Sequence, residues 1–344
     1  MLNERPVSDE PAKSDSASVV DSPREQRFES LLSSPTISID SLRGLSWKGI
    51  PPQYRPKVWK ILIGYLPNVL DRHAGTIERK HAEYREIVEQ HFGPDARRDE
   101  AIMHQIAIDV PRTAPNLALF RNAIVREALA RILYCWSIRR PASGYVQGIN
   151  DLVTPFYDVF LSEYISAIGS PSTTVSLPEN ALFKVEADSF WCLSKLLDSI
   201  QDNYTFNQTG ISRQISRMKD ILTRTDPKLL IHLDKQEVSL LQFAFRWVNC
   251  LLMREFPLHM IIRMWDTYLS EDENGFSEFH TYVCAAFLSK WSSELQKLEF
   301  QDIILFLQNP PTDTWSLTDL EVLLSEAFVW KSLFHGSSGH FQKT

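Results

Sequence analysis

The chain has 344 residues, a formal net charge of -7 and 44% hydrophobic residues. This length allows one large domain or two ordinary ones with a sizeable core. The hydrophobic content excludes a wholly disordered chain. The mild acidity argues against nucleic acid or an anionic membrane as the main partner. No apolar run reaches the length of a membrane span.

The cysteines and histidines do not suggest a metal site. Four cysteines lie far apart in apolar, helix-like contexts, and no pair of cysteines or histidines has metal-ligand spacing: Cys135, Cys192, Cys250 and Cys284. We therefore expect reduced core cysteines in a cytoplasmic protein and no bound metal.

The N-terminal part divides by composition. Residues 1–26 are rich in Ser, Asp, Glu and Pro and predict a disordered tail. Residues 27–41 contain Phe28, Leu31 and Leu32 and predict a segment that docks on the domain that follows. The chain end, residues 335–344, is expected to be flexible.

Helical patterns begin near Asp40, where Gly44 is expected to interrupt a first helix. A second helix is predicted from about Gln53 to Pro67, with one apolar face made of Trp59, Leu62, Ile63 and Leu66. Four acids are expected on a solvated helix face: Asp71, Glu78, Glu83 and Glu86. From Asn116 to Ile138 one amphipathic helix is predicted, because apolar residues recur at every fourth position: Phe120, Ile124, Ala128, Ile132 and Trp136.

The second half of the chain is also helical in pattern. Residues 166–178 predict a surface loop, and Val238–Leu252 predicts a central buried helix because it is apolar nearly all round. Further helices are predicted at Glu186–Ile200, Pro257–Tyr268, Phe279–Trp291, Phe300–Leu307 and Thr318–Phe334. Strand-like alternation is absent and glycine is scarce, at 12 residues, so the predicted fold class is all-α.

Two short segments carry long hydrogen-bonding side chains. Arg112 lies between Pro111 and Pro115, which stiffen the chain on either side of an exposed guanidinium. Gln147 lies between Gly144 and Gly148, which permit unusual backbone shapes and a close approach by a partner. Taken singly, Arg112 also fits an ordinary surface arginine and Gln147 a simple turn between helices.

An arginine and a glutamine are the pair of groups that GTP hydrolysis requires. The arginine neutralises charge that develops on the phosphoryl oxygens, and the glutamine amide orients the attacking water. The chain has no phosphate-cradling loop of its own, so the nucleotide would arrive on another protein. Metalloprotease and serine-hydrolase motifs are also absent, and Asp266 is expected to be a buried, paired structural acid rather than a general base.

Three motifs occur in order, and together they are typical of one family. They are Arg55 with Trp59, then Ile106 with Asp109 and Arg112, then Tyr145 with Gln147. The chain from residue 42 to 334 resembles the TBC domain of Rab GTPase-activating proteins. The resemblance implies a multi-helix, all-α domain with two helical subdomains, a half that carries both motif loops at about 42–165 and a second helical half at about 186–334.

The resemblance also implies a catalytic pair that acts on a partner's nucleotide. Arg112 would be an arginine finger and Gln147 a glutamine finger, each entering the active site of a Rab protein. The residues implied to support the site are Asp109, Arg55, Trp59, Tyr145, Ile106 and Gly148. We further hypothesise that Asp109 pairs with Arg55.

The implied partner is a GTP-bound Rab small GTPase, with GTP and Mg²⁺ held by the Rab and no cofactor held by this chain. The implied role is in vesicle traffic, with membrane association only through partners. Residues 143–155 and 243–256 look closest to the Golgi-associated branch of the family, so recruitment to Golgi membranes is expected. A catalytically silent Rab-binding scaffold and an unrelated helical interaction protein are the alternatives; retention of both fingers favours the activator.

Overall fold

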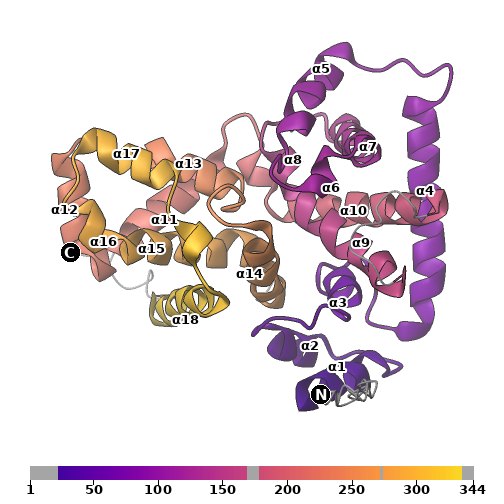
Figure 1. The fold of residues 1–344 in the computed structure, drawn as a ribbon, viewed down its shortest axis with the longest axis horizontal. Helices are drawn as coiled ribbons and strands as arrows, with labels where there is room; N and C mark the ends of the chain where they lie inside the picture. The colour runs from indigo at the N-terminus through magenta and orange to yellow at the C-terminus, as the bar shows by residue number, and fades with distance from the viewer. Residues whose placement is uncertain (1–21, 169–177, 272–273, 335–344) are drawn as a thin grey trace, which may run out of the picture.

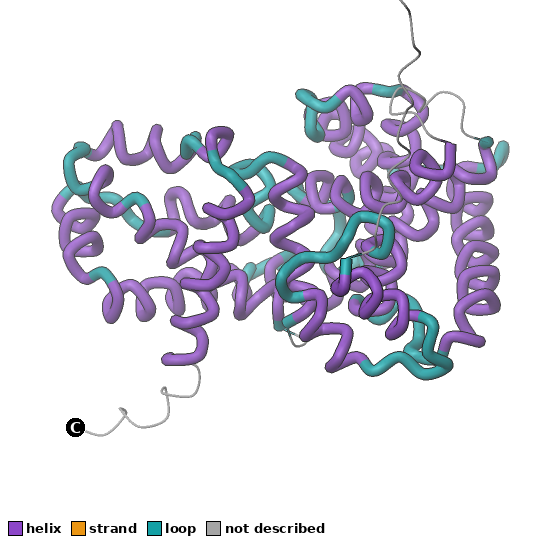
Figure 2. Tube along the Cα trace, turned by 60° about the horizontal axis from the view of Figure 1, so that its bottom comes forward, coloured by secondary structure: helices purple, strands orange, loops and turns teal. Residues whose placement is uncertain are grey.

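The computed structural model describes residues 22–168, 178–271 and 274–334. Over these residues the chain is helical, with a single isolated bridge between Thr36 and Val69 and no strand (Figure 2). No helix in the described ranges is long and apolar enough to cross a membrane. The predicted all-α fold class is confirmed.

The helices form two lobes that lie side by side (Figure 1). The first lobe consists of α1 (Pro23–Leu32), α2 (Ile39–Ser46), α3 (Arg55–Leu62), η1 (Leu70–Arg72), α4 (His73–Phe92), α5 (Glu100–Asp109), η2 (Val110–Arg112), α6 (Ala118–Arg121), α7 (Ala123–Arg139), α8 (Ile149–Leu152), α9 (Thr154–Ile168) and α10 (Glu179–Ser199). At its centre α10 packs against α4, α7 and α9. Because α10 belongs to this lobe, the second half begins later than the predicted residue 186.

The second lobe follows α10 directly. It consists of η3 (Gln201–Asn203), α11 (Thr209–Thr225), α12 (Pro227–Lys235), α13 (Leu241–Asn249), α14 (Leu258–Ser270), η4 (Gly275–Phe279), α15 (His280–Lys290), α16 (Ser292–Leu295), α17 (Phe300–Gln308), η5 (Thr312–Thr314) and α18 (Leu317–Phe334). Its buried centre is α15, which packs against α11, α13 and α18. The helix α14 contacts α2, α3 and α9 as well as α18, and so joins the two lobes (Figure 1).

In the N-terminal part of the chain, the predicted helices differ from the observed ones at three points. Residues 23–26, expected in the tail, form the first turn of α1, where Ser22 and Glu25 make a reciprocal capping box. Gly44 lies inside α2 and does not interrupt it. The helix α3 ends at Leu62, before Gly64 at φ +74°, and not at Pro67.

The predicted helix over Asn116–Ile138 is two helices, α6 and α7. They are separated at Asn122, whose side chain accepts a hydrogen bond from the backbone N–H of Ile124 at 2.9 Å and caps α7. This cap turns the helix, so Ile124 is 46% exposed although it belongs to the predicted apolar stripe. The apolar pattern with a period of four residues therefore predicted helical structure correctly but did not predict the break between α6 and α7.

The predicted buried helix over Val238–Leu252 is shorter than expected. Only Leu241–Asn249 is helical, and Leu251 and Leu252 take left-handed backbone angles of φ +50° and +59°. The other predicted helices are confirmed as α10, α14, α15, α17 and α18. Most of the predicted tail, the core of the predicted loop at 169–177 and the chain end at 335–344 lie outside the described residues.

Candidate functional site

The arginine loop is the turn that follows α5. The side chain of Asp99 caps the start of this helix, and the fully buried Ile106 anchors its last turn in the core. Asp109 ends α5, and η2 then places Pro111 and Arg112 in a single 3₁₀ turn. The guanidinium of Arg112 is exposed and, among the described residues, makes no hydrogen bond or ion pair. It is free to meet a partner's charge.

The glutamine loop connects α7 to α8 and presents Gln147. The side chain of Gln147 is exposed, while its backbone carbonyl accepts a hydrogen bond from Asn249 Nδ2 at 3.1 Å. Gly148 follows at φ +107°, and a Cβ placed there would lie 2.6 Å from Asn249 Nδ2 and 2.9 Å from Cys250 Sγ. Glycine is required at 148 for both its backbone angle and its close approach to the second lobe.

One buried network ties the two loops together. Tyr145 in the glutamine loop donates its hydroxyl to Asp109 Oδ2 of the arginine loop at 2.9 Å. Asn150 Nδ2 donates to Thr113 Oγ1 at 3.0 Å, and Asn150 Oδ1 accepts from the backbone N–H of Gly148 at 3.0 Å. Burial and the neighbouring carboxylate of Asp109 raise the pKa of Tyr145, so its hydroxyl stays protonated and donating.

Sequence reasoning missed Thr113 and Asn150. Thr113 is fully buried and its hydroxyl also donates to the carbonyl of Asp109 at 3.1 Å, so it closes the arginine loop. Asn150 is 2% exposed and lies in α8 directly after the glutamine loop. The signal available in the sequence was a pair of polar residues, Asn150 and Asp151, inside an otherwise apolar stretch.

The second lobe supports the glutamine loop from behind. Arg254 Nε donates to Asp151 Oδ2 at 2.8 Å, and the hydroxyl of Tyr204 donates to the carbonyl of Asn249 at 2.8 Å. Burial raises the pKa of Asp151, and the Arg254 guanidinium opposes that shift. Residues more than one hundred positions away in the chain therefore hold the carbonyl of Gln147 and the side chain of Asp151.

Arg55 and Trp59 of the first motif meet Asp266 and not Asp109. Asp266 is fully buried on α14 and accepts from Trp59 Nε1 at 2.7 Å, from Arg55 Nε at 3.1 Å and from the backbone N–H of Ile50 at 2.9 Å. Burial raises the pKa of this carboxyl, and the Arg55 guanidinium opposes the shift. The hypothesised pairing of Asp109 with Arg55 is wrong, whereas the prediction of Asp266 as a buried, paired acid is confirmed.

The cysteines and the acidic residues of α4 lie in the places that the sequence predicts, in the core and on the surface. All four cysteines are free and buried, and burial raises the pKa of Cys135 and of Cys250 to about 12, which keeps both thiols protonated. In the described ranges no group of histidine, cysteine and acidic side chains could hold a metal ion. On α4, Glu78 and Glu86 are exposed as predicted, and Glu83 pairs with Arg79 and Lys80.

Comparison with known proteins identifies the class. Residues 52–296 match the Rab-GTPase-TBC domain, and the chain belongs to this family. Its fold is similar to the crystal structure of the Ypt/Rab-GAP domain of Gyp1p, with a TM-score of 0.85 and 49% identity over 90% of this chain and 98% of that one.

Two curated relatives narrow the comparison. The chain is 52% identical to the GTPase-activating protein gyp1 of Schizosaccharomyces pombe, over 93% of this chain and 63% of that protein. It is 50% identical to TBC1 domain family member 22A of Homo sapiens, over 93% of this chain and 62% of that protein. The chain thus spans less than two thirds of the length of these relatives.

Proposed function

We propose that this protein is a GTPase-activating protein for Rab-family small GTPases, with Arg112 and Gln147 as its two fingers. The observation that carries the proposal is the shared network beneath them, in which Tyr145 binds Asp109 and Asn150 binds Thr113. The exposed side chains of Arg112 and Gln147 therefore extend from two loops whose relative position is fixed by hydrogen bonds. The name of the fission-yeast relative, a GTPase-activating protein, supports the same activity.

Each finger has a separate role in this mechanism. Arg112 places its guanidinium against the phosphoryl oxygens of the partner's GTP, where its planar fork spans two oxygens. Gln147 orients the attacking water through its side-chain amide. The GTP and Mg²⁺ belong to the Rab, and this chain supplies geometry and charge. Because the loops are rigid before binding, less conformational entropy is lost when the fingers engage.

The proposed partner is the GTP-loaded form of a Rab, since only that form carries the phosphoryl group on which the fingers act. Membrane association is proposed to occur through that partner or another protein. The Golgi-like stretches at residues 143–155 and 243–256 support a Golgi or early-secretory Rab as substrate and a cytoplasmic protein recruited to Golgi membranes.

The experiment is phosphate release from a panel of GTP-loaded Rabs with wild type, Arg112→Ala and Gln147→Ala. We expect wild type to accelerate a few Rabs and both variants to lose that acceleration. The loss is expected to be smaller for Gln147→Ala, because the Rab's own glutamine can partly substitute. Preserved GTP-dependent binding without acceleration of any Rab would instead make the protein a Rab-binding scaffold.

A further inference from the structure

A strongly basic pocket lies in the first lobe, between the loop after α3 and helices α4, α7 and α10. Its volume is about 520 Å³, a size that suits a small-molecule ligand. One carboxylate, that of Asp198, lines it together with six cationic side chains: Arg72, Arg79, Lys80, Arg139, Arg140 and Lys195. This is an unusual concentration in a chain that carries 43 acidic and 36 basic residues.

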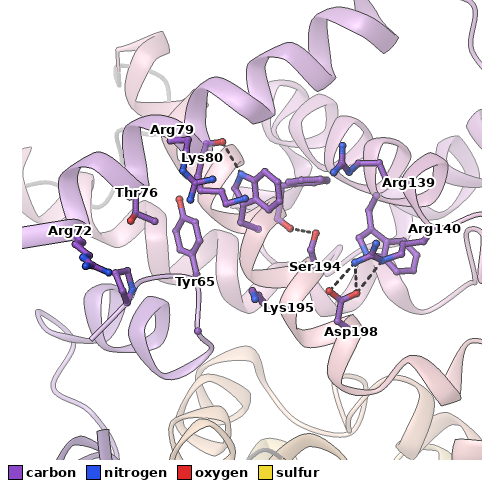
Figure 3. Close-up of a pocket in the computed structure, with 15 residues that line it drawn as sticks. Tyr65, Arg72, Thr76, Arg79, Lys80, Arg139, Arg140, Ser194, Lys195 and Asp198 are labelled. Carbon is purple, nitrogen blue, oxygen red and sulfur yellow. Dashed lines mark hydrogen bonds and ion pairs between the residues drawn. The ribbon is translucent and has the colours of Figure 1, made fainter. Parts of the chain in front are cut away.

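The cations approach the pocket from different elements. Figure 3 shows Arg72, Arg79 and Lys80 on one side and Arg139 and Arg140 on the other, with Ser194 and Lys195 of α10 between them. Cations on opposite walls of a concave site reinforce one another's potential and attract a multiply charged anion more strongly than the same cations spread over a convex surface.

Half of these cations lack a counter-charge. The side chains of Arg72, Arg139 and Lys195 are exposed and form no ion pair or hydrogen bond within the described part of the chain. The other three are already paired: Arg79 and Lys80 bind Glu83, and Arg140 binds Asp198. Unpaired cations that line one pocket repel one another weakly in water, and an anion bound among them removes that repulsion.

One of the cations is held at the pocket wall by an aromatic side chain. Lys80 Nζ lies 3.7 Å from the centroid of the Trp191 ring, and Trp191 Nε1 donates to the Lys80 carbonyl at 2.9 Å. These two contacts fix the position of the Lys80 ammonium.

We infer that this pocket binds a ligand bearing two or more phosphate groups on a compact ring, such as a phosphorylated inositol. Guanidinium and ammonium groups are the standard partners of phosphate, and three unpaired cations match more than one phosphate. The same chemistry is present in a soluble inositol phosphate and in the headgroup of a phosphorylated inositol lipid.

The position of the pocket connects it to the glutamine loop. Arg139 ends α7 and Arg140 caps it, and the carbonyl of Arg140 accepts from the backbone N–H groups of Ser143 at 3.0 Å and Gly144 at 2.8 Å. The Arg140 guanidinium holds Asp198 through both carboxylate oxygens, at 2.6 Å and 2.8 Å. A phosphate bound at Arg139 would therefore lie next to the residue from which the glutamine loop begins.

The test is calorimetric binding of inorganic phosphate and of inositol trisphosphate to the full chain. The pocket variant is Arg139→Glu with Lys195→Glu. The milder variant Lys195→Gln replaces it in the test if the double variant does not fold. The matched control is Lys219→Glu with Lys228→Glu, which makes the same charge change at exposed positions outside the pocket. We expect wild type and control to bind the trisphosphate and the pocket variant to bind at least about tenfold more weakly.

Vesicles of phosphatidylcholine, with and without a phosphorylated inositol lipid, distinguish a lipid headgroup from a soluble inositol phosphate as the ligand. Co-sedimentation only with the phosphorylated lipid would assign a membrane headgroup, and binding of free trisphosphate without co-sedimentation would assign a soluble ligand. Amide hydrogen exchange over residues 143–148 should slow when the ligand binds.

Two results would overturn the inference. They are no binding of trisphosphate by wild type and equal binding by wild type and the pocket variant. Because binding is measured without a Rab, the inference can fail while the proposed activity holds.

Discussion

Arg112 and Gln147 extend from backbones that other side chains hold in place. Arg112 itself makes no hydrogen bond or ion pair in the described structure, while its neighbours Asp109 and Thr113 make several. Gln147 uses only its backbone for support, through Asn249. This separation leaves the two side chains free, while the conformational entropy of the loop backbones is lost on folding and not on binding a partner.

The first prediction concerns the chemistry of the arginine. Arg112→Lys should lower the rate of activated GTP hydrolysis nearly as far as Arg112→Ala, by about 10³-fold or more. A lysine retains the charge but lacks the planar fork that spans two phosphoryl oxygens. Single-turnover phosphate release measures the effect. Both variants should melt like wild type, and a lysine variant as active as wild type would refute the finger assignment.

The second prediction concerns the brace between the loops. Thr113→Val keeps the shape of the side chain but removes the hydroxyl that accepts from Asn150 Nδ2. We expect a fall in the maximal rate of about tenfold, equivalent to about 1.4 kcal/mol of barrier. The matched control, Thr113→Ser, retains the hydroxyl and should remain close to wild type.

Two quantities separate positioning from binding. One is the maximal rate of GTP hydrolysis when this protein is saturating, and the other is the concentration of this protein that gives half of that rate. A positioning role lowers the former more than it raises the latter. If Thr113→Val and Thr113→Ser behave alike, the hydrogen bond to Asn150 does not position the fingers.

Helices α3 and α14 illustrate how elements far apart in the chain become one unit. Arg55 and Trp59 on α3 both bind Asp266 on α14, so the first sequence motif fastens the two lobes together. A buried carboxylate is tolerated here because three donors satisfy it. The motif therefore supports the site indirectly, by holding the lobe that carries Asn249 against the lobe that carries the fingers.

The third prediction follows from that contact. In a double-mutant cycle on the free energy of unfolding, Arg55→Met and Asp266→Asn should couple by about 1–3 kcal/mol. The parallel cycle with Asp109→Asn is the control, and its two changes should add within about 0.5 kcal/mol. Chemical denaturation measures both cycles. Strong coupling of Arg55 to Asp109 and none to Asp266 would contradict the observed pairing.

One hydrophobic core runs through both lobes, and its part in the second lobe contains a buried histidine that makes stability depend on pH. His280 is fully buried at the start of α15, where its ring contacts the Tyr268 hydroxyl at 2.9 Å and the Trp247 carbonyl at 3.0 Å. Burial lowers the pKa of His280 from 6.5 to about 4. The folded state therefore keeps the imidazole neutral at a pH where the unfolded chain protonates it.

The fourth prediction gives the sign of that effect. Below pH 6.5 the unfolded state binds a proton that the folded state refuses, so stability falls down to about pH 4, where the folded group also titrates. The fall due to this histidine approaches about 1.4 kcal/mol for each pH unit. Urea denaturation between pH 7 and pH 4.5 should give a shallower pH dependence for His280→Gln than for wild type; equal slopes would exclude His280 as the cause.

Both lobes contribute to the site, which explains why a single segment of the chain could not define it. The glutamine loop belongs to the first lobe, yet Asn249 and Arg254 of the second lobe hold its carbonyl and its neighbour Asp151. Loss of contact between the lobes should therefore loosen Gln147 even though no residue of the loop has changed.

Local patterns were sufficient for the fold class and for most helices, because apolar periodicity repeats within a few residues. The prediction of Arg112 and Gln147 as fingers came instead from the resemblance of three ordered motifs to a family, since each residue taken singly also fits an ordinary position. Side-chain capping at Asn122 and left-handed turns at Leu251 and Leu252 escaped this reading, because they interrupt helices without interrupting the apolar pattern.

The polar partners were settled by packing. Asp109 lies beside Tyr145 and not Arg55, and Asp266 lies beside Arg55 and Trp59, because these pairs are joined by the way helices stack and not by spacing along the chain. A buried carboxylate must find donors wherever the fold brings them. The periodicity of the sequence does not determine which of several arginines or tyrosines will be the donor. The hydrogen-bond network beneath the fingers is therefore determined by the tertiary structure.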